Sequence, residues 1–542
     1  MKRTSPIPAG PPLPGPAEIG SRIPVQWALL VALLCLLTVA AVVVGDGNAA
    51  VALAPCAMAL LVGSIWVLPL RVPMLVLLAL SWTLEIAGDG FAQGLVQTPL
   101  RVVGSLLFAK LNLSIPIDAL VFSGFDLLML LFAVVSIYRR STRSQIDRAS
   151  WVESPRPIWQ FAMLSLVAIA WITLFGLARG GSFRFALWQI TRHLYLPLVY
   201  LLMAEALRGP ADAAIFGRIV LGVGIFRSIE AMFLRHLYPS TDILPHATTH
   251  HDSVLFATCI AILIAMFLEK PTARTLKICA LLLPVFVGGI NANHRRLVWT
   301  ELGAVVAFFF LITPLGRVKR FVLRSMAALM VPILIYVGIG WNSQARGFGP
   351  VRTLRSLFDA SVDASTRWRD IENYNLVVTF FRNPLLGSGF GHPFVQEQKL
   401  PDVTNDYELE PYIPHNSVLG LWAFGGLLGF ALLWGIYPVG MFFTLRAYRW
   451  ARTPSERITA LGAAAVQICY VMQGYGDLGF GTWGPVFTVA VSYALVGKIC
   501  VANGGWPALR ARMADRSLVQ APGIPPPATL QFPRGRPGTS EG

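Results

Sequence analysis

Charged residues are scarce in this chain. Only 13% of its 542 residues are Asp, Glu, Lys or Arg, about half the share that a soluble domain usually carries. Apolar runs of about 20 residues, each long enough to cross a bilayer, follow one another through most of the sequence. We therefore exclude a cytosolic enzyme and a disordered protein, and we expect a polytopic membrane protein.

Cysteine is rare too, with six in the whole chain. None has the spacing of a metal-ligand set or a redox motif, so we expect all six to be packing residues. A small disulfide-stapled secreted protein is excluded. The net charge of +16 is carried by short basic clusters between apolar runs, a pattern typical of membrane proteins rather than of nucleic-acid binders.

The apolar runs predict an all-α fold with about fourteen transmembrane helices (12–14). The expected spans cover residues 25–45, 49–68, 72–87, 117–138, 158–178, 190–206, 212–233, 252–269, 275–291, 298–314, 322–340, 416–445, 456–475 and 482–500. Residues 88–116 could hold a surface or re-entrant helix.

The chain then divides into five parts. Residues 1–23 and 503–542 are rich in Pro and Gly and predict disordered tails. Spans one to eleven occupy residues 24–340, a large loop occupies 341–415, and the last three spans occupy 416–502. We find no internal repeat of the kind that marks many transporters.

Basic residues predict the orientation. With the N-terminus inside, alternate loops carry the dense clusters 139–156, 270–277, 317–324 and 446–457, and the C-terminal tail falls on the same side. This is the positive-inside pattern. Both termini are therefore expected in the cytoplasm and the large loop outside.

Several arginines depart from that pattern because they lie on the outer side. Guanidinium groups bind phosphate oxygens bidentately, so a set of outer arginines favours a phosphate-bearing ligand. Pairing with loop carboxylates or lipid headgroups is the alternative for any single arginine. The outer arginines are Arg179, Arg184, Arg192, Arg295, Arg296, Arg346, Arg352, Arg355, Arg367, Arg369 and Arg382.

All eight histidines also fall at or near the outer side. His246, His250 and His251, with Asp252, have a spacing that could hold a metal ion, but no second ligand set accompanies them. We expect a polar loop there and no metal.

Two arginines lie within a predicted span, Arg218 and Arg227. A charge at that depth needs a partner or a polar cavity. Glu230, three residues after Arg227, is the partner indicated by helical spacing, and a polar groove is the alternative.

Two stretches of the large loop contain candidate site residues. The run Asn383-Pro-Leu-Leu-Gly-Ser-Gly389-Phe-Gly-His392 lacks the preceding strand of a dinucleotide fingerprint and predicts a tight turn near a ligand or the membrane surface. In Pro414-His415-Asn416-Ser417, Asn416 predicts the N-cap of the next helix, whose positive end would face a phosphate. Gly425 and Gly429 predict close helix packing.

The order of Arg367, the 383–391 turn, His415-Asn416 and Gly425-Gly426 resembles the bacterial O-antigen ligase and O-antigen polymerase superfamily, with its short motifs between about residues 290 and 430. The resemblance implies a GT-C-type glycosyltransferase of the bacterial inner membrane, active at the periplasmic face. Such enzymes take a glycan from undecaprenyl diphosphate and transfer it to an acceptor hydroxyl, without a metal ion or other cofactor.

Carried over by position, the family's histidine is His415 and its arginines are Arg367 and either Arg295 or Arg296, of which we prefer Arg296. His415 would act as the general base, and the arginines would stabilise the departing diphosphate. Direct displacement would invert the anomeric configuration. Further substrate-binding candidates are Arg295, Arg369, Arg192, Asn416 and Gly389.

Alternatives remain at this point. A ligase would use lipid A core or another final acceptor, whereas a polymerase would use a growing glycan. Asp402, Asp406, Glu408 and Glu410 offer a rival base. From other classes, a transporter of lipid-linked glycans would show interrupted helices and ionisable residues at mid-membrane, and a non-catalytic scaffold would leave the histidine and the arginines unexplained.

Overall fold

The fold was analysed in a computed structural model. It describes residues 29, 31–40, 42, 43, 56, 59, 60, 62–66, 68–84, 104, 107, 108, 122–142, 151–240, 246–314, 316–343, 345–348, 351, 355, 364–400, 409–476 and 479–508. The predicted tail 1–23, the region 88–116 apart from three positions, and the C-terminal tail after 508 lie outside the described residues.

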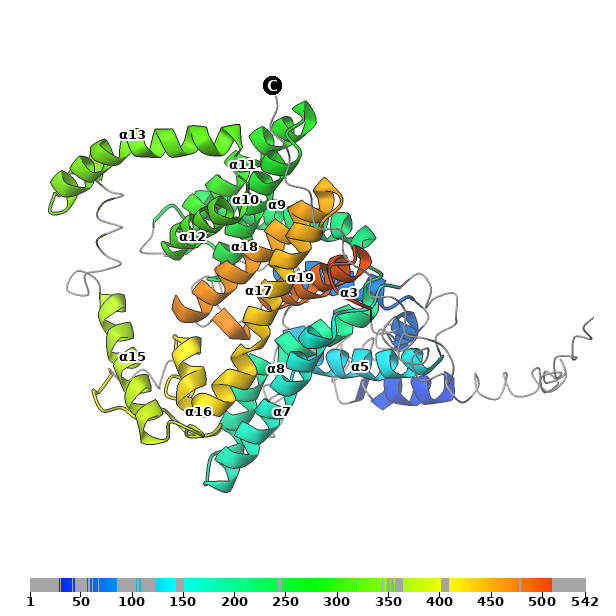
Figure 1. The fold of residues 1–542 in the computed structure, drawn as a ribbon. Helices are drawn as coiled ribbons and strands as arrows, with labels where there is room; N and C mark the ends of the chain where they lie inside the picture. Colours follow the sequence, from blue (N-terminus) through cyan, green and yellow to red (C-terminus); the bar gives the residue numbers. More distant parts are fainter. Residues whose placement is uncertain are drawn as a thin grey trace, which may run out of the picture. The chain divides into compact units, whose positions relative to one another are not determined.

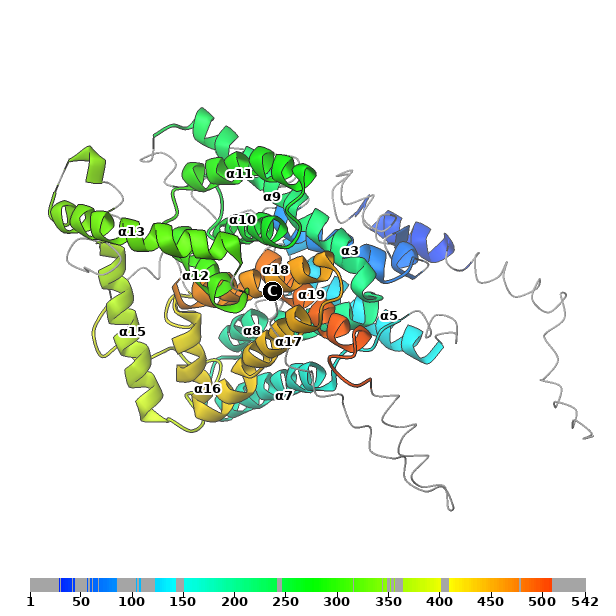
Figure 2. The same cartoon turned by 45° about the horizontal axis from the view of Figure 1, so that its top comes forward.

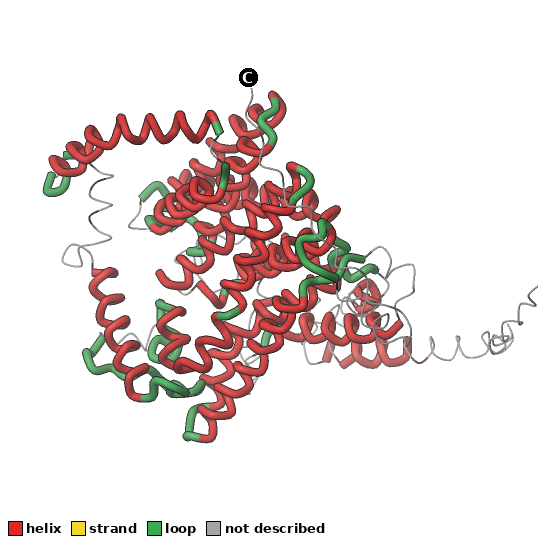
Figure 3. Tube along the Cα trace, viewed as in Figure 1, coloured by secondary structure: helices red, strands yellow, loops and turns green. Residues whose placement is uncertain are grey.

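Every element of regular structure in the described ranges is a helix (Figures 1 and 3). The α-helices are α3 (Arg71–Thr83), α5 (Gly124–Thr142), α7 (Arg156–Ala178), α8 (Phe183–Ala206), α9 (Ala213–Leu237), α10 (Asp252–Glu269), α11 (Ala273–Asn293), α12 (Leu297–Ile312), α13 (Arg317–Gly340), α15 (Ala364–Arg382), α16 (Ser417–Trp434), α17 (Ile436–Trp450), α18 (Pro454–Gly476) and α19 (Trp483–Ala502). Short 3-10 helices are η2 (Pro210–Asp212), η3 (Arg346–Phe348) and η4 (Gly479–Gly481).

Six stretches of the described chain are long and apolar enough to cross a membrane: α7, α10, α11, the segment Ser417–Trp450, α18 and α19. The segments Phe183–Ala206 and Pro210–Leu237 pass the same test only as a pair, bent by 107°, and make a seventh if they form one span. Large apolar side chains such as Leu174, Leu281 and Leu311 are more than 60% exposed, as expected for helices that face hydrocarbon. The prediction of a polytopic, all-helical membrane protein is confirmed.

The chain forms two compact units, residues 1–73 and 74–542. Within the second unit, α10, α18 and α19 are the most buried of the apolar helices. One group of helices packs around α10 and α18 and includes α9, α11 and α12. Another joins α7, α8, α16, α17 and α19, and α15 packs on α16 (Figures 1 and 2). The loop between α13 and α16 thus contains a helix of its own, which the sequence did not predict.

Candidate active site at the start of α16

Four polar residues join α15 to the start of α16. The side-chain nitrogen Nδ2 of Asn416 donates to Asn373 Oδ1 at 2.9 Å. Next to this pair, His415 contacts Glu372. The two pairs are adjacent on both elements, so they fix the position of α15 against the start of α16 in two places.

The contact between His415 and Glu372 involves three hydrogen bonds. The backbone N–H of His415 donates to both carboxylate oxygens of Glu372, at 3.1 Å each. The ring nitrogen Nδ1 lies 3.2 Å from Glu372 Oε1. The Glu372 side chain is completely buried, whereas the His415 side chain is 30% exposed. A carboxylate on Nδ1 selects the tautomer in which Nε2 has the lone pair and can accept a proton.

Asn416 caps α16, as predicted. Its side-chain oxygen accepts from the Leu419 N–H at 3.0 Å, and helix α16 begins at Ser417. The first amides of α16 and the positive end of its dipole therefore lie directly beside His415. This part of the molecule is electrostatically suited to a negatively charged group.

Helix α16 is broken at Gly426, and the 383–392 turn fills the break. Gly426 has φ 59° and ψ −167°, which is outside helical space. The freed groups bond to the turn: Leu427 N–H donates to Pro384 O at 2.8 Å, and Gly389 N–H donates to Phe424 O at 2.9 Å. Backbone polar groups inside an apolar bundle must be satisfied by protein, and here two chain segments satisfy each other.

The same turn is attached to α7 and α8. Phe390 N–H donates to Ile172 O at 3.2 Å, and His392 Nε2 lies 3.0 Å from Gly176 O. Gly389, with φ 83°, comes so close to α7 that an added Cβ would lie 2.4 Å from Gly176 Cα. The predicted tight turn is present, and what Gly389 approaches is protein backbone. Its assignment to substrate binding stays a prediction.

A recess adjoins this junction. Helix α8 contributes Gln189, Arg192 and His193 to its lining, the segment leading into α16 contributes Tyr412, and α16 itself contributes Ser417. The lining of a second recess also includes Arg192 and His193 and is otherwise mostly apolar and aromatic. The predicted candidate Arg192 thus lines both recesses, next to the residues that flank His415 and Asn416.

Arg367 and Arg369 lie in the first half of α15, upstream of Glu372. Arg367 is exposed, and Arg369 is partly buried. One helix therefore carries two of the predicted arginines and the carboxylate that contacts His415.

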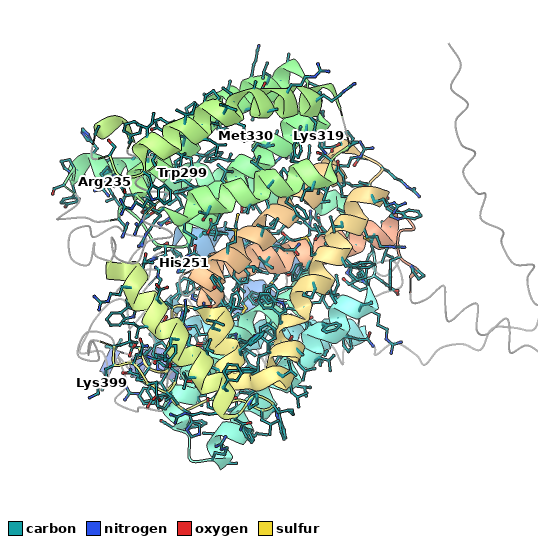
Figure 4. All side chains as sticks on the ribbon, turned by 60° about the vertical axis from the view of Figure 1, so that its left-hand side comes forward. Arg235, His251, Trp299, Lys319, Met330 and Lys399 are labelled. Carbon is teal, nitrogen blue, oxygen red and sulfur yellow. The ribbon has the colours of Figure 1, made fainter. Side chains whose placement is uncertain are left out.

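Arg295 and Arg296 belong to a different place, the turn between α11 and α12, where Arg296 is the N-cap residue of α12. Neither lines the two recesses. Burial, followed by the positive charge of Arg235, lowers the pKa of neighbouring His294, so His294 is neutral near pH 7 and adds no charge to the two arginines. In Figure 4, Arg235 and Trp299 mark this end of the α9–α12 group.

Arg227 of α9 is paired, as predicted, with Glu230 at 2.6 Å. It also makes a bidentate contact with Asp252, with Nη2–Oδ2 at 2.7 Å and Nε–Oδ1 at 3.1 Å. Arg218 is exposed.

The histidine cluster next to Asp252 has a spacing that could hold a metal ion. The Asp252 carboxylate accepts hydrogen bonds from Arg227 and Thr249. The described residues contain no group of three or more His, Cys, Asp and Glu that could hold a metal.

Of the predicted rival bases, Asp402, Asp406 and Glu408 lie outside the described residues. Glu410 is described and is buried, with 3% of its surface exposed. Glu372 contacts both the backbone and the ring of His415.

Sequence reasoning missed Glu372. A signal was present, because Glu372, Asn375 and Thr379 follow the spacing of one helix face, and all three are buried in the structure. Asn375 and Thr379 bond the segment 395–398, with Asn375 Nδ2 to Gln398 O at 2.7 Å and Val395 N to Thr379 Oγ1 at 2.8 Å. The spacing of these three residues predicts a buried polar helix face, but it does not identify His415 as the residue that contacts this face.

Residues 279–434 match the family model described as O-antigen ligase. This segment is similar to O-antigen ligases. The match confirms the resemblance predicted from the sequence, and its range includes the α11–α12 turn, α15, the 383–392 turn, His415 and all of α16. No curated protein matches the chain with significance.

Proposed function

We propose that the protein is an O-antigen ligase-like glycosyltransferase of cell-surface polysaccharide biosynthesis. It would move a glycan from undecaprenyl diphosphate to an acceptor hydroxyl at the periplasmic face of the bacterial inner membrane. The observation that carries the proposal is the His415–Glu372 pair at the positive end of α16, inside the segment that matches the O-antigen ligase family model.

In the proposed reaction, His415 Nε2 takes the proton of the acceptor hydroxyl as its oxygen attacks the anomeric carbon. A positioned base accelerates such a reaction by about 10²–10⁴-fold. The bond between that carbon and the phosphate oxygen breaks, and the electron pair leaves with the diphosphate. Attack opposite the leaving group inverts the anomeric configuration.

Arginines would stabilise the charge that grows on the diphosphate. We assign this role to Arg367 on α15 and, on the sequence resemblance alone, to Arg296 in the α11–α12 turn. Arg369, Arg192, Arg295 and the amides of α16 next to Asn416 would assist. Charge-assisted bidentate bonds from guanidinium groups suit a phosphate leaving group. Because fixed cations can supply this stabilisation, we propose that the reaction needs no metal ion.

For the whole chain, we propose a GT-C-like architecture of about fourteen spans with both termini in the cytoplasm. The basic clusters between the apolar segments support this orientation. The described helices support the polytopic arrangement.

A transporter of lipid-linked glycans is the second candidate, because the break of α16 at Gly426 is the kind of interruption that transporters use for substrate binding. Here the backbone groups freed by the break bond to the 384–389 segment. They are not available for a substrate or an ion, so the break supports the transferase over the transporter.

The test is transfer by the purified protein in liposomes, supplied with undecaprenyl diphosphate oligosaccharide and either lipid A core or free glycan acceptor, with and without a chelator. We expect transfer that chelation does not diminish. A single added block on lipid A core identifies a ligase, and a ladder of glycan lengths identifies a polymerase. Movement of the lipid-linked glycan across the bilayer without transfer would contradict the proposal and favour the transporter.

A further inference from the structure

The carboxylate of Glu372 is buried and therefore needs hydrogen-bond donors within the protein. It is completely enclosed, and a carboxylate removed from water is costly unless hydrogen bonds compensate. Among the described residues, the hydrogen bonds to this carboxylate come from the backbone N–H and the ring of His415. The arrangement therefore ties the buried carboxylate of Glu372 to the position of the His415 imidazole.

We propose that Glu372 is the positioning residue for His415. Its carboxylate holds the proton on Nδ1, keeps the lone pair on Nε2, and stabilises the imidazolium that forms when Nε2 takes the acceptor's proton. Glu372 does not itself take the proton, which the imidazolium later releases to water. This inference rests on the proposed function, in which His415 is the base.

Two features of α15 support this role over a purely structural one. First, the carboxylate reaches the ring as well as the backbone; a link that only held the loop would not require a ring contact, as the neighbouring Asn373–Asn416 pair illustrates. Second, Asn375 and Thr379 on the same helix face fix the 395–398 segment. Helix α15 is thereby fixed at several points along one face, so Glu372 has little freedom to follow a misplaced ring.

The helix also carries Arg367 and Arg369, two of the residues assigned to the diphosphate. A rigid helix keeps those cations and Glu372 at a constant spacing, so the group that orients the base and the groups that hold the leaving group move together. Catalytic constellations require this kind of fixed geometry, because displacements of about 1 Å can cost 10²-fold in rate.

The test is steady-state transfer by Glu372→Gln in liposomes, with kcat and KM measured separately for donor and acceptor. Gln has the same shape but lacks the charge. We expect kcat to fall about 10²-fold or more, while both KM values and the melting temperature stay near those of the wild type. That split marks an interaction made in the transition state rather than in the bound complex.

Two further variants keep the test decisive. Glu372→Asp keeps the charge and should recover much of the rate lost in Glu372→Gln, and it is informative even if the Gln variant folds poorly. Glu397→Gln removes a carboxylate of the same loop whose pair with Arg382 is more than half exposed, and it should transfer like the wild type.

A wild-type kcat in Glu372→Gln, or a raised KM with unchanged kcat, would overturn the positioning role. Equal losses in the Asp and Gln variants, accompanied by a lowered melting temperature, would assign Glu372 to folding alone and also overturn it. If the wild-type protein itself transfers nothing, the proposed function fails instead.

Discussion

At the scale of single residues, the sequence reveals a charged side chain's partner only when both residues lie on the same helix. Glu230 could be named as a partner of Arg227 because the two are three residues apart on one helix. Asp252, which makes the bidentate contact, lies on the next helix. Helical spacing cannot identify a partner brought in by packing between helices. For the same reason the sequence did not predict the contact of Glu372 with His415, which lies on another element.

Glu301 carries a further prediction at this scale. Its side chain in α12 is fully buried, and neither carboxyl oxygen has a hydrogen-bond partner among the described residues. Burying a polar group without a partner costs roughly 1–3 kcal/mol. We therefore expect Glu301→Met, which fills a similar volume without polar oxygens, to raise the free energy of unfolding by about that amount. Thermal unfolding in detergent measures the change.

A loss of stability in Glu301→Met would show that the carboxyl makes a compensating interaction. Transfer should be measured on the same sample, since intramembrane carboxyls often have a functional role. The expected result is a more stable protein with unchanged transfer.

At the scale of elements, some features of helix α16 can be predicted from its local sequence and others cannot. Asn416 as its cap and Gly425 and Gly429 as a small packing face could be predicted, and the latter two meet Ile172 of α7 closely. The break at Gly426 could not, because it depends on the 384–389 segment, which supplies the missing hydrogen bonds from a distant part of the sequence. Helix α15 was missed because its polar sequence lacks the apolar periodicity by which helices are recognised.

Gly426→Ala tests the break. A side chain there would adopt a backbone conformation reserved for glycine, which costs about 1–3 kcal/mol, and its Cβ would lie 2.4 Å from Gly387 N. We expect lower thermal stability and reduced transfer, because the displaced turn also carries the attachment to α7. Gly303→Ala is the matched control, since nothing lies within 4 Å of an added Cβ there, and helix propensity favours Ala by up to about 1 kcal/mol.

If Gly426→Ala were as stable and active as Gly303→Ala, the turn and the break would not depend on each other. The packing described between α16 and the 383–392 turn would then not be needed to hold the start of α16.

At the scale of the whole molecule, composition predicted a polytopic helical membrane protein, and the described helices agree. The number of spans is harder to obtain from the sequence. Several apolar helices are short, such as Leu297–Ile312, and α8 and α9 pass the length and hydropathy test only as a bent pair. Length and hydropathy cannot distinguish two short spans from one bent one.

The proposed orientation makes a prediction that does not depend on activity. In a chain whose native cysteines are replaced, Lys399→Cys should react with a membrane-impermeant maleimide added outside intact inner-membrane spheroplasts, and Arg274→Cys should react only after permeabilisation. Both positions are exposed, and Figure 4 marks Lys399 in the segment after α15. The opposite labelling pattern would contradict the positive-inside assignment and the periplasmic site.

The central claim is that His415 is the base of a glycan transferase. The most direct measurement compares transfer by wild type, His415→Ala and His236→Ala in liposomes with undecaprenyl diphosphate oligosaccharide and acceptor. His236 is an exposed histidine in the last turn of α9 and serves as the control. We predict that His415→Ala loses about 10²–10⁴-fold in transfer rate with donor binding retained, and that His236→Ala transfers normally. Transfer by His415→Ala at the wild-type rate would contradict the account.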